Sequence, residues 1–210
     1  MSIRVLIAED HQIVRQGIKA LLVREGFQVV GEAADGQEAV KLAESHQPDA
    51  VVLDVSMPVL NGLEAVRELG RSCPKTKAVL LTRYDGDQYV LAALRAGAKG
   101  YVLKSQAAMD LVQAIRDVCN GGVYLSPGVS RAVVDAFLSR SELTEERLTA
   151  RERQVLQLVA EGKTTKEVAT ILGISVKTAE SHRTRVMQKL DIHATAGLVR
   201  YAIRSGLIEA

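Results

Sequence analysis

The stretch AVVLD, residues 50–54, is almost continuously apolar and ends on an aspartate. A strand without a polar side is typical of a parallel sheet that helices cover on both faces. Four more runs of strand length lie in the same part of the chain: residues 3–8, 28–34, 77–82 and 99–103. Helical patterns separate these runs, so the sequence predicts a doubly wound, five-stranded parallel α/β sheet over residues 1–120.

The pattern changes at Gly121 and Gly122, which interrupt the helical pattern before them. Pro127 suits the first turn of a short helix over residues 127–138, and residues 139–147 are polar enough for a linker. Helical patterns alone follow, in four segments joined by short turns: residues 150–160, 166–172, 176–190 and 194–205.

This division predicts a domain of residues 1–120, a linker of residues 121–145 that includes the short helix, and an all-α four-helix domain of residues 146–210. The net charge of +2 is unevenly distributed among them. The last part carries 11 Lys and Arg against 7 Asp and Glu, whereas the first carries 14 against 15. Such a basic unit suits contact with a polyanion, although a solvated helical face has the same composition.

Cysteine usage and hydropathy both indicate a protein of a reducing, aqueous compartment. Cys73 and Cys119 are isolated, lack the spacing of metal ligands and suit buried thiols. No apolar run approaches the about 20 residues that a membrane helix needs, and the N-terminal segment turns acidic after one short apolar run. We expect a soluble, cytoplasmic protein without a membrane partner.

Acidic side chains follow two of the predicted strands. Glu9 and Asp10 come directly after the first strand, and Asp54 ends the third. Parallel sheets place their sites at the carboxyl ends of strands, and these two strands are expected to be neighbours. Clustered carboxylates repel one another unless a cation neutralises them, and oxygen ligands at a hydrated site favour Mg²⁺. An aspartate beside Mg²⁺ can act as a nucleophile toward a phosphoryl group.

Two further residues complete this constellation. Lys104 follows the fifth strand, and its ammonium suits a phosphoryl oxygen. Thr82 ends the fourth strand, and its hydroxyl can donate to another oxygen. The alternative is helix capping by Asp10 and a turn at Thr82, without a shared site.

Four segments that carry these residues resemble the receiver domain of response regulators: IAED (7–10), VLDVSMPVLNG (52–62), LLT (80–82) and GYVLK (100–104). The resemblance covers essentially all of residues 1–120 and implies a flavodoxin-like fold. It also implies that a sensor histidine kinase phosphorylates Asp54. The Mg²⁺ ligands that it implies are Asp10, Asp54 and the Ser56 backbone carbonyl, with Glu9 acting through water.

The resemblance further implies a switch, in which Thr82 moves toward the phosphate and Tyr101 turns inward behind it. Two residues depart from the family pattern. Arg83 stands where the family usually has a small residue or Met, and its guanidinium either covers the phosphoryl site or points to solvent. Ser105 follows Lys104 where many receivers have Pro.

Residues 164–190 show the pattern of a helix, a turn and a second helix, with Gly173 in the turn and Ser175 as an N-cap. The second helix has an apolar side: Val176, Ala179, Val186 and Leu190. Its opposite side is polar and has cations at its edges: Lys177, Glu180, Ser181, Thr184 and Gln188, flanked by Arg183, Arg185 and Lys189. This surface suits a DNA major groove, and an ordinary amphipathic helix has the same pattern.

Three segments of this part closely resemble the LuxR-type DNA-binding domain: LTARERQVLQLVAEG (148–162), EVATILGISVKTAESH (167–182) and RVMQKL (185–190). Four residues of the second helix hold phosphates by this resemblance: Lys177, Thr178, Arg183 and Arg185. Three others face the bases: Glu180, Ser181 and Thr184. A further backbone contact would come from the start of the preceding helix, at Lys163, Thr164 and Thr165.

Together, the chain is identified by resemblance as a member of the NarL/FixJ subfamily of two-component response regulators. This implies a sensor histidine kinase, double-stranded promoter DNA and RNA polymerase as partners, and a homodimer when active. In this subfamily the last helix, here residues 194–205, joins two DNA-binding domains. Its apolar residues either do so here or pack on the core of their own domain: Leu198, Val199, Tyr201 and Ala202.

Two other functions stay open at this point. Phosphatases of the haloacid dehalogenase type also use a strand-ending Asp with Mg²⁺, but they carry a second Asp two residues later, and here that residue is Ser56. We therefore expect no enzyme, apart from slow loss of the chain's own phosphoryl group. The other alternative is a DNA-binding regulator that a partner or ligand controls without phosphorylation. The presence of all five receiver residues argues against it, and Arg83 is the one reason to keep it open.

Overall fold

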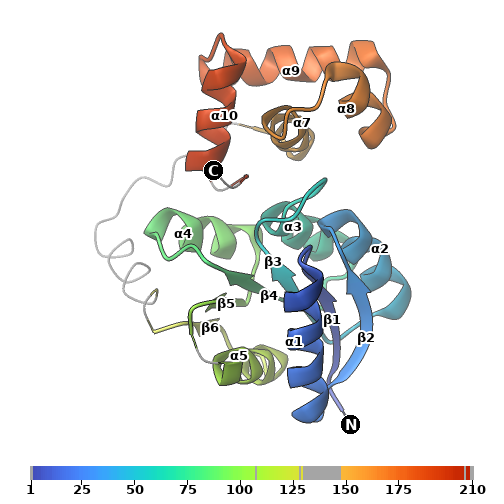
Figure 1. Cartoon of the computed structure of the whole chain (residues 1–210), viewed down its shortest axis with the longest axis vertical. Helices are drawn as coiled ribbons and strands as arrows, with labels where there is room; N and C mark the ends of the chain where they lie inside the picture. The colour runs from blue at the N-terminus through green and yellow to red at the C-terminus, as the bar shows by residue number, and fades with distance from the viewer. Residues whose placement is uncertain (1, 107, 128, 130–147, 206, 209–210) are drawn as a thin grey trace. The chain divides into compact units, whose positions relative to one another are not determined.

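The computed structural model of the chain describes residues 2–106, 108–127, 129, 148–205 and 207–208 (Figure 1). The chain divides into two compact units, Met1–Ser141 and Glu142–Ala210. Most of the predicted helix over residues 127–138 and all of the predicted linker over residues 139–147 lie outside the described residues.

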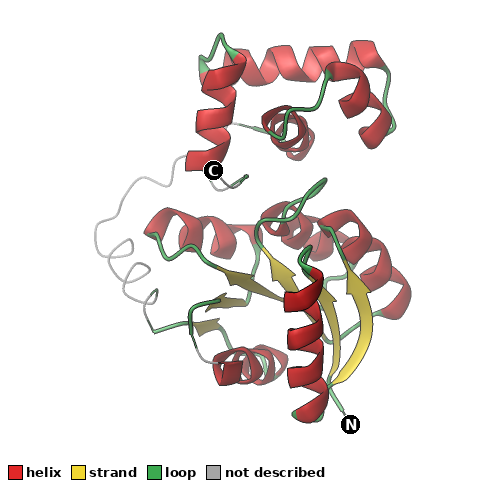
Figure 2. Cartoon of the chain, in the orientation of Figure 1, coloured by secondary structure: helices red, strands yellow, loops and turns green. Residues whose placement is uncertain are grey.

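The N-terminal unit alternates strands and helices along the chain (Figure 2). Its strands are β1 (Arg4–Ala8), β2 (Gln28–Ala33), β3 (Ala50–Asp54), β4 (Lys77–Thr82), β5 (Gly100–Leu103) and β6 (Tyr124–Leu125). Its helices are α1 (Gln12–Arg24), α2 (Gly36–His46), α3 (Gly62–Ser72), α4 (Asp87–Ala96) and α5 (Ala108–Cys119). All strand pairs are parallel, in the order β2-β1-β3-β4-β5-β6. The predicted doubly wound α/β fold is confirmed.

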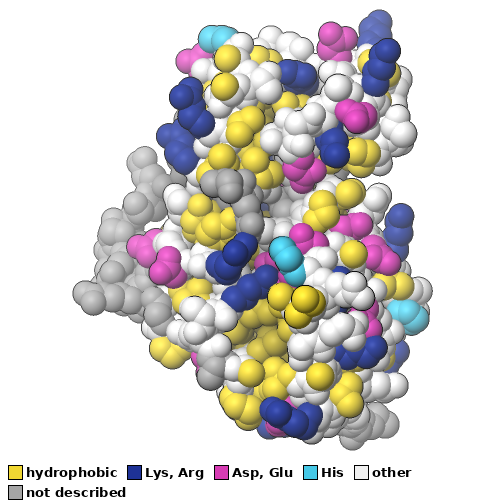
Figure 3. Space-filling view, in the orientation of Figure 1, with side chains coloured by type: hydrophobic (Ala, Val, Ile, Leu, Met, Phe, Trp, Pro, Cys, Tyr) yellow, Lys and Arg dark blue, Asp and Glu magenta, His cyan; other side chains and the backbone are white. Residues whose placement is uncertain are grey.

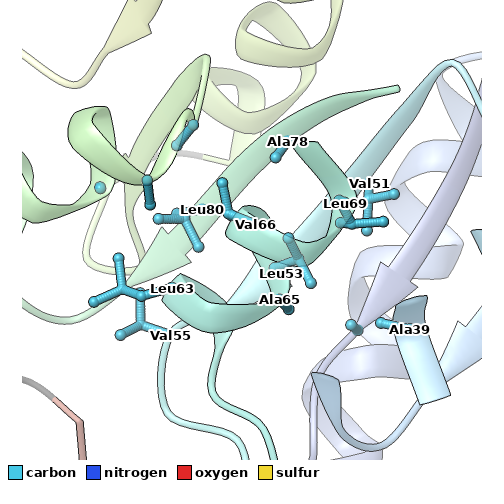
Figure 4. Packing of buried hydrophobic residues seen from close by; sticks show 14 of the residues in the cluster. Ala39, Val51, Leu53, Val55, Leu63, Ala65, Val66, Leu69, Ala78 and Leu80 are labelled. Atoms are coloured by element: carbon cyan, nitrogen blue, oxygen red, sulfur yellow. The ribbon is translucent and has the colours of Figure 1, made fainter. Parts of the chain in front are cut away.

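Helices cover both faces of the sheet, and all five residues of β3 are buried. Val51 and Leu53 of this strand belong to the core that α2, α3 and α4 complete, and Figure 4 shows Leu53 and Leu80 of the sheet near Val66 of α3. Val52 points to the opposite core, which α1 and α5 complete. Successive side chains of β3 alternate between the two faces of the sheet and enter both cores. This explains why the strand has no polar side.

The sheet has six strands rather than the five that the sequence predicted. Tyr124 pairs with Gly100 and Leu125 with Tyr101 in a parallel ladder. This edge strand has only two residues, both half-buried, so it carries no apolar run for a sequence pattern to detect. The sheet thus continues into the segment that was expected to be linker.

The C-terminal unit consists of four helices among the described residues: α7 (Ala150–Ala160), α8 (Thr165–Leu172), α9 (Val176–Leu190) and α10 (Thr195–Arg204). The side chains of Thr149, Thr164 and Ser175 each accept a backbone hydrogen bond as the N-caps of α7, α8 and α9. Gly173 ends α8 with a φ of 64°, the left-handed conformation that glycine adopts readily. The predicted four-helix domain is confirmed, with helix ends within one residue.

On the face in Figure 3, hydrophobic side chains gather over the part of the N-terminal unit where α1 and α5 lie. Ile13 and Val23 of α1 and Met109 of α5 are the large hydrophobic residues exposed on these helices, besides the less exposed Val14.

No helix in the described part of the chain combines the length and the apolar composition that a membrane span requires.

Candidate metal centre and nucleic-acid interface

Three carboxylates meet at the carboxyl edge of the sheet. Glu9 and Asp10 follow β1, Asp54 ends β3, and these strands are paired neighbours. One ligand atom from each carboxylate and one ring nitrogen of His11 lie within 4.8 Å of one another. Glu9 is 1% exposed and Asp54 5%, so two of the three charges are withdrawn from water. The structure thus brings together the acidic residues that the sequence singled out.

Lys104, which follows β5, supplies a cation to this cluster. Its Nζ lies 2.8 Å from Glu9 Oε2 and 2.9 Å from Asp54 Oδ2. Burial alone lowers the pKa of this ammonium, but the hydrogen bond to Glu9 and the charge of Asp54 outweigh it and raise the pKa. Lys104 therefore stays charged at neutral pH and links the two buried carboxylates.

Lys104 does not fully compensate for the burial of the Asp54 carboxylate. Burial raises the pKa of Asp54, and Lys104 only partly opposes that shift. Asp10 Oδ1 is buried, and His11 Nδ1 lies 2.7 Å from it, a contact that is an ion pair when the imidazole is protonated. Oxygen atoms crowded in this way fit a divalent cation such as Mg²⁺.

Thr82 and Tyr101 are joined through a residue that sequence reasoning missed, Tyr84. Thr82 Oγ1 accepts the Tyr84 backbone N–H at 3.1 Å, and the Tyr101 hydroxyl donates to the Tyr84 carbonyl oxygen at 2.8 Å. The Ser56 hydroxyl donates to the Tyr84 hydroxyl at 3.5 Å, and the Tyr84 ring stacks on Tyr89. Tyr84 therefore connects the two predicted switch residues to α4 by contacts that no sequence motif signals.

Tyr101 and Arg83 differ in their exposure to solvent. The ring of Tyr101 is already buried in this structure, and burial raises the pKa of its hydroxyl. The inward turn expected on phosphorylation is therefore the position that the ring has here. Arg83 is exposed to solvent.

We expect Asp54→Asn to stabilise the metal-free chain. A raised carboxyl pKa means that the charged form is disfavoured by folding, so this group lowers stability as the pH rises above its usual value of 3.8. The neutral amide removes that penalty, and we expect a gain of about 1 kcal/mol at neutral pH, as at other strained functional sites. Urea unfolding in the presence of a chelator measures it; a variant less stable than the original chain would contradict this electrostatic interpretation.

Helix α9 exposes most of the polar side chains that were predicted to meet DNA. The exposed ones are Lys177, Thr178, Glu180, Ser181, Thr184, Arg185, Gln188 and Lys189. Ala179 and Val186 are buried in the core of the unit, as the apolar stripe predicted. Val176 was expected in that stripe but is 45% exposed, at the first position of the helix.

Two cations of α9 are held by neighbouring helices. Arg183 is half-buried, and its Nη2 donates to Thr195 Oγ1 at the start of α10 (2.8 Å). Lys189 Nζ lies 2.7 Å from Glu152 Oε2 of α7. Part of the predicted cationic edge of α9 thus also joins the helices of the unit.

At the start of α8, fewer backbone N–H groups are available for a DNA phosphate than the predicted contact assumes. Thr164 and Glu167 form a capping box, in which each side chain accepts the backbone N–H of the other. Lys163 is exposed and Thr165 is half-buried in the first turn. A phosphate at this end would therefore meet the Lys163 ammonium and the N–H groups that the box leaves over.

The last helix, α10, divides its apolar residues between two roles. Leu198 and Ala202 are fully buried in the core of their own unit. Val199 and Tyr201 are only partly buried. Of the residues considered for dimerisation, these two are the ones with surface left to offer a second copy.

Glu152 makes the stability of the C-terminal unit depend on pH. Burial alone raises the pKa of Glu152, but the hydrogen bonds from Lys189 and Thr149 outweigh it and lower the pKa below 4.5. A lowered carboxyl pKa stabilises the fold above 4.5, and that stability is lost as the pH falls through the folded value. We expect Glu152→Gln to cost about 1 kcal/mol at neutral pH and much less in acid.

Urea unfolding monitored by the helical circular dichroism signal checks this at neutral pH and below 4.5. Glu180→Gln is the matched control, because Glu180 is an exposed glutamate of α9. Equal losses for the two variants, or a Glu152→Gln loss that persists in acid, would show that the ion pair is not the cause.

Two family models match the chain. The response regulator receiver domain matches residues 5–116, more than half of the chain, and the luxR family of bacterial regulatory proteins matches residues 146–202. The oxygen regulatory protein NreC of Staphylococcus carnosus is 38% identical over 98% of this chain and 99% of its own length. The transcriptional regulatory protein MctR of Rhizobium johnstonii is 37% identical over 99% and 96%.

Solved structures agree with these sequence relatives. RcsB from Salmonella enterica serovar Typhimurium, bound to a promoter in the presence of a phosphomimetic, is 30% identical, with a TM-score of 0.64 over 96% of this chain and 98% of its own. A LuxR-family two-component response regulator from Aurantimonas is 35% identical, with a TM-score of 0.63 over 66% and 99%. The chain therefore belongs to the two-component response regulators that join a receiver domain to a luxR-type helix-turn-helix domain and bind DNA.

Proposed function

We propose that Asp54 accepts a phosphoryl group from a sensor histidine kinase and that this phosphorylation controls promoter binding by α9. The observation that carries the proposal is the joint placement of Glu9, Asp10, Asp54 and Lys104 at one edge of the sheet. In the transfer, an Asp54 carboxylate oxygen forms a bond to phosphorus while the bond to the histidine nitrogen breaks.

The residues around Asp54 suit a divalent cation during this transfer. Asp10, Asp54 and the Ser56 backbone carbonyl would hold Mg²⁺, with Glu9 acting through water. Bound Mg²⁺ would neutralise charge on the phosphoryl oxygens. Lys104 already lies against Asp54, so its ammonium would pair with a phosphoryl oxygen after a small movement.

Thr82 and Tyr101 would pass the change to the surface. The Thr82 oxygen accepts a hydrogen bond from the Tyr84 N–H, and the Thr82 side chain also hydrogen-bonds Tyr101. The Thr82 hydroxyl would exchange the Tyr101 contact for a phosphoryl oxygen. Movement of Thr82 displaces Tyr84, whose carbonyl holds Tyr101 and whose ring stacks on α4. We propose that this repacking of α4 and β5 is the two-state element that phosphorylation biases.

In the C-terminal unit, we propose that α9 enters the major groove of promoter DNA. Phosphates would be held by Lys177, Thr178, Arg183 and Arg185, with Lys163, Thr164 and Thr165 adding a contact at α8. Bases would be read by Glu180, Ser181 and Thr184, which are exposed side by side on the helix. The promoter-bound RcsB structure and the structure of two RcsB dimers bound to two parallel DNAs support DNA binding by a homodimer.

RNA polymerase is a further proposed partner, since a promoter-bound regulator acts on transcription through it. A cytoplasmic location follows from these partners.

The phosphoryl-acceptor role is tested by treating the full chain with acetyl phosphate and Mg²⁺. Intact mass spectrometry is expected to show the addition of one phosphoryl group, and peptide mapping should assign it to Asp54. A chain that stays unmodified would favour control by a partner or ligand instead. Steady turnover of a small phosphate ester would favour a phosphatase.

A further inference from the structure

The loop that carries Glu9 and Asp10 is fastened by residues outside the acidic cluster. On one side, the Glu9 backbone N–H donates to the Ala33 carbonyl oxygen at the end of β2 (3.1 Å). On the other, Nη1 of Arg15 on α1 donates to the Glu9 carbonyl oxygen. The backbone N–H and the carbonyl oxygen of Glu9 are therefore both fixed, although the loop belongs to neither the sheet ladder nor the helix.

Arg15 is itself held in place by Glu32 of β2. The Arg15 Nε lies 3.8 Å from Glu32 Oε2, and the Arg15 side chain is 17% exposed. Glu32 also accepts hydrogen bonds from Lys19 Nζ (2.6 Å) and Gln16 Nε2 (2.9 Å), both from α1. Of these three α1 side chains, Arg15 also contacts the Glu9 carbonyl, so it joins β2 to the acidic loop.

The hydrogen bonds to the Glu9 backbone oppose the electrostatic repulsion within the acidic cluster. Glu9, Asp10 and Asp54 repel one another, and repulsion favours conformations in which the loop after β1 moves away from β3. Residues that orient metal ligands without binding the metal themselves typically contribute 10- to 100-fold to metal affinity, which is lost when they are removed. Arg15 lies in that position relative to Glu9.

We infer that Arg15, anchored on Glu32, is a positioning residue that holds the Glu9–Asp10 loop in the geometry that binds a divalent cation. The inference rests on the proposed metal site at Asp54 and deepens it. Arg15 acts through the Glu9 backbone and needs no contact with the metal or the phosphoryl group.

The test measures Mn²⁺ binding to the full, unphosphorylated chain from the electron paramagnetic resonance signal of the free ion. We expect Arg15→Met, which keeps the apolar part of the side chain, to weaken Mn²⁺ binding roughly tenfold. Glu32→Gln should weaken binding by a smaller factor, because it loosens the Arg15 guanidinium without removing it. Lys19→Met is the matched control and should bind as the original chain does, since Lys19 pairs with Glu32 but not with the loop.

A second measurement separates positioning from general damage to the fold. The rate of phosphorylation by acetyl phosphate is followed as the Mg²⁺ concentration rises. A positioning role predicts that Arg15→Met needs more Mg²⁺ for half-maximal rate and reaches the original maximum when saturated. A lowered maximum that Mg²⁺ does not restore would indicate structural damage and overturn the inference.

Unchanged Mn²⁺ affinity in both Arg15→Met and Arg15→Lys would also overturn it, as would an equal loss in Lys19→Met. Should Arg15→Met fail to fold, Glu32→Gln and Arg15→Lys carry the same test. Absence of Mn²⁺ binding by the unaltered chain would instead contradict the proposed metal site, and the inference with it.

Discussion

The Asp54→Asn variant should incorporate roughly 100-fold less phosphoryl group than the unaltered chain, because the carboxylate is the nucleophile and an amide oxygen is a far weaker one. The variant keeps the shape of the side chain, so Glu9, Lys104 and Thr82 should retain their places around it. Labelled acetyl phosphate with Mg²⁺, followed by intact mass spectrometry, measures the incorporation.

Asp87→Asn is the control for this experiment. Asp87 is an exposed aspartate in the first turn of α4, outside the acidic cluster. We expect it to be phosphorylated as the original chain is. Incorporation into Asp54→Asn at the original rate would place the acceptor elsewhere and contradict the proposed role of residue 54.

The double variant Lys177→Ala with Arg185→Ala should lose DNA affinity by roughly 10- to 100-fold at physiological salt. Both side chains are exposed on α9, and neither forms an ion pair with another residue in the described part of the chain. Each phosphate contact releases counterions, so removing two should reduce the slope of log affinity against log salt by about 2. Fluorescence anisotropy with a promoter fragment that the chain selects from genomic DNA, repeated over a salt series, measures both quantities.

Lys75→Ala with Lys99→Ala is the matched control, because it removes the same charge from exposed positions of the α/β unit. It should leave the affinity and the salt slope nearly unchanged. If both double variants lower affinity equally, the effect is one of net charge, and α9 is not the surface that contacts the phosphates.

The sequence predicted the α/β fold well because burial on both faces leaves a direct trace in composition. β3 is apolar at consecutive positions since Val52 faces one core while Val51 and Leu53 face the other. β6 left no such trace, because an edge strand of two half-buried residues is held by ladder hydrogen bonds to β5, which depend on backbone rather than on side-chain type.

The site was predictable where topology alone brings residues together. Parallel neighbours end at the same edge, so Asp10 and Asp54 had to approach each other once β1 and β3 were paired. Tyr84 and Arg15 could not be predicted in the same way. Their proposed roles depend on individual contacts: the Tyr101 hydroxyl donates to the Tyr84 carbonyl oxygen, and the Arg15 guanidinium donates to the Glu9 carbonyl oxygen. No spacing rule encodes such contacts.

On α9, the period of 3.6 correctly separated the buried Ala179 and Val186 from the exposed polar residues. It was wrong for Val176, because periodicity says which side a residue lies on but not how far the neighbouring helices reach. Helix ends are where that distinction matters most.

The affinity of one preparation for its promoter fragment, measured before and after phosphorylation by acetyl phosphate and Mg²⁺, tests the link between the two units most directly. Binding should tighten by roughly 5- to 150-fold on phosphorylation, the usual range of coupling between two sites. Asp54→Asn, measured in parallel, should show no change. Equal affinities of the phosphorylated and unphosphorylated chain would contradict control of DNA binding by Asp54.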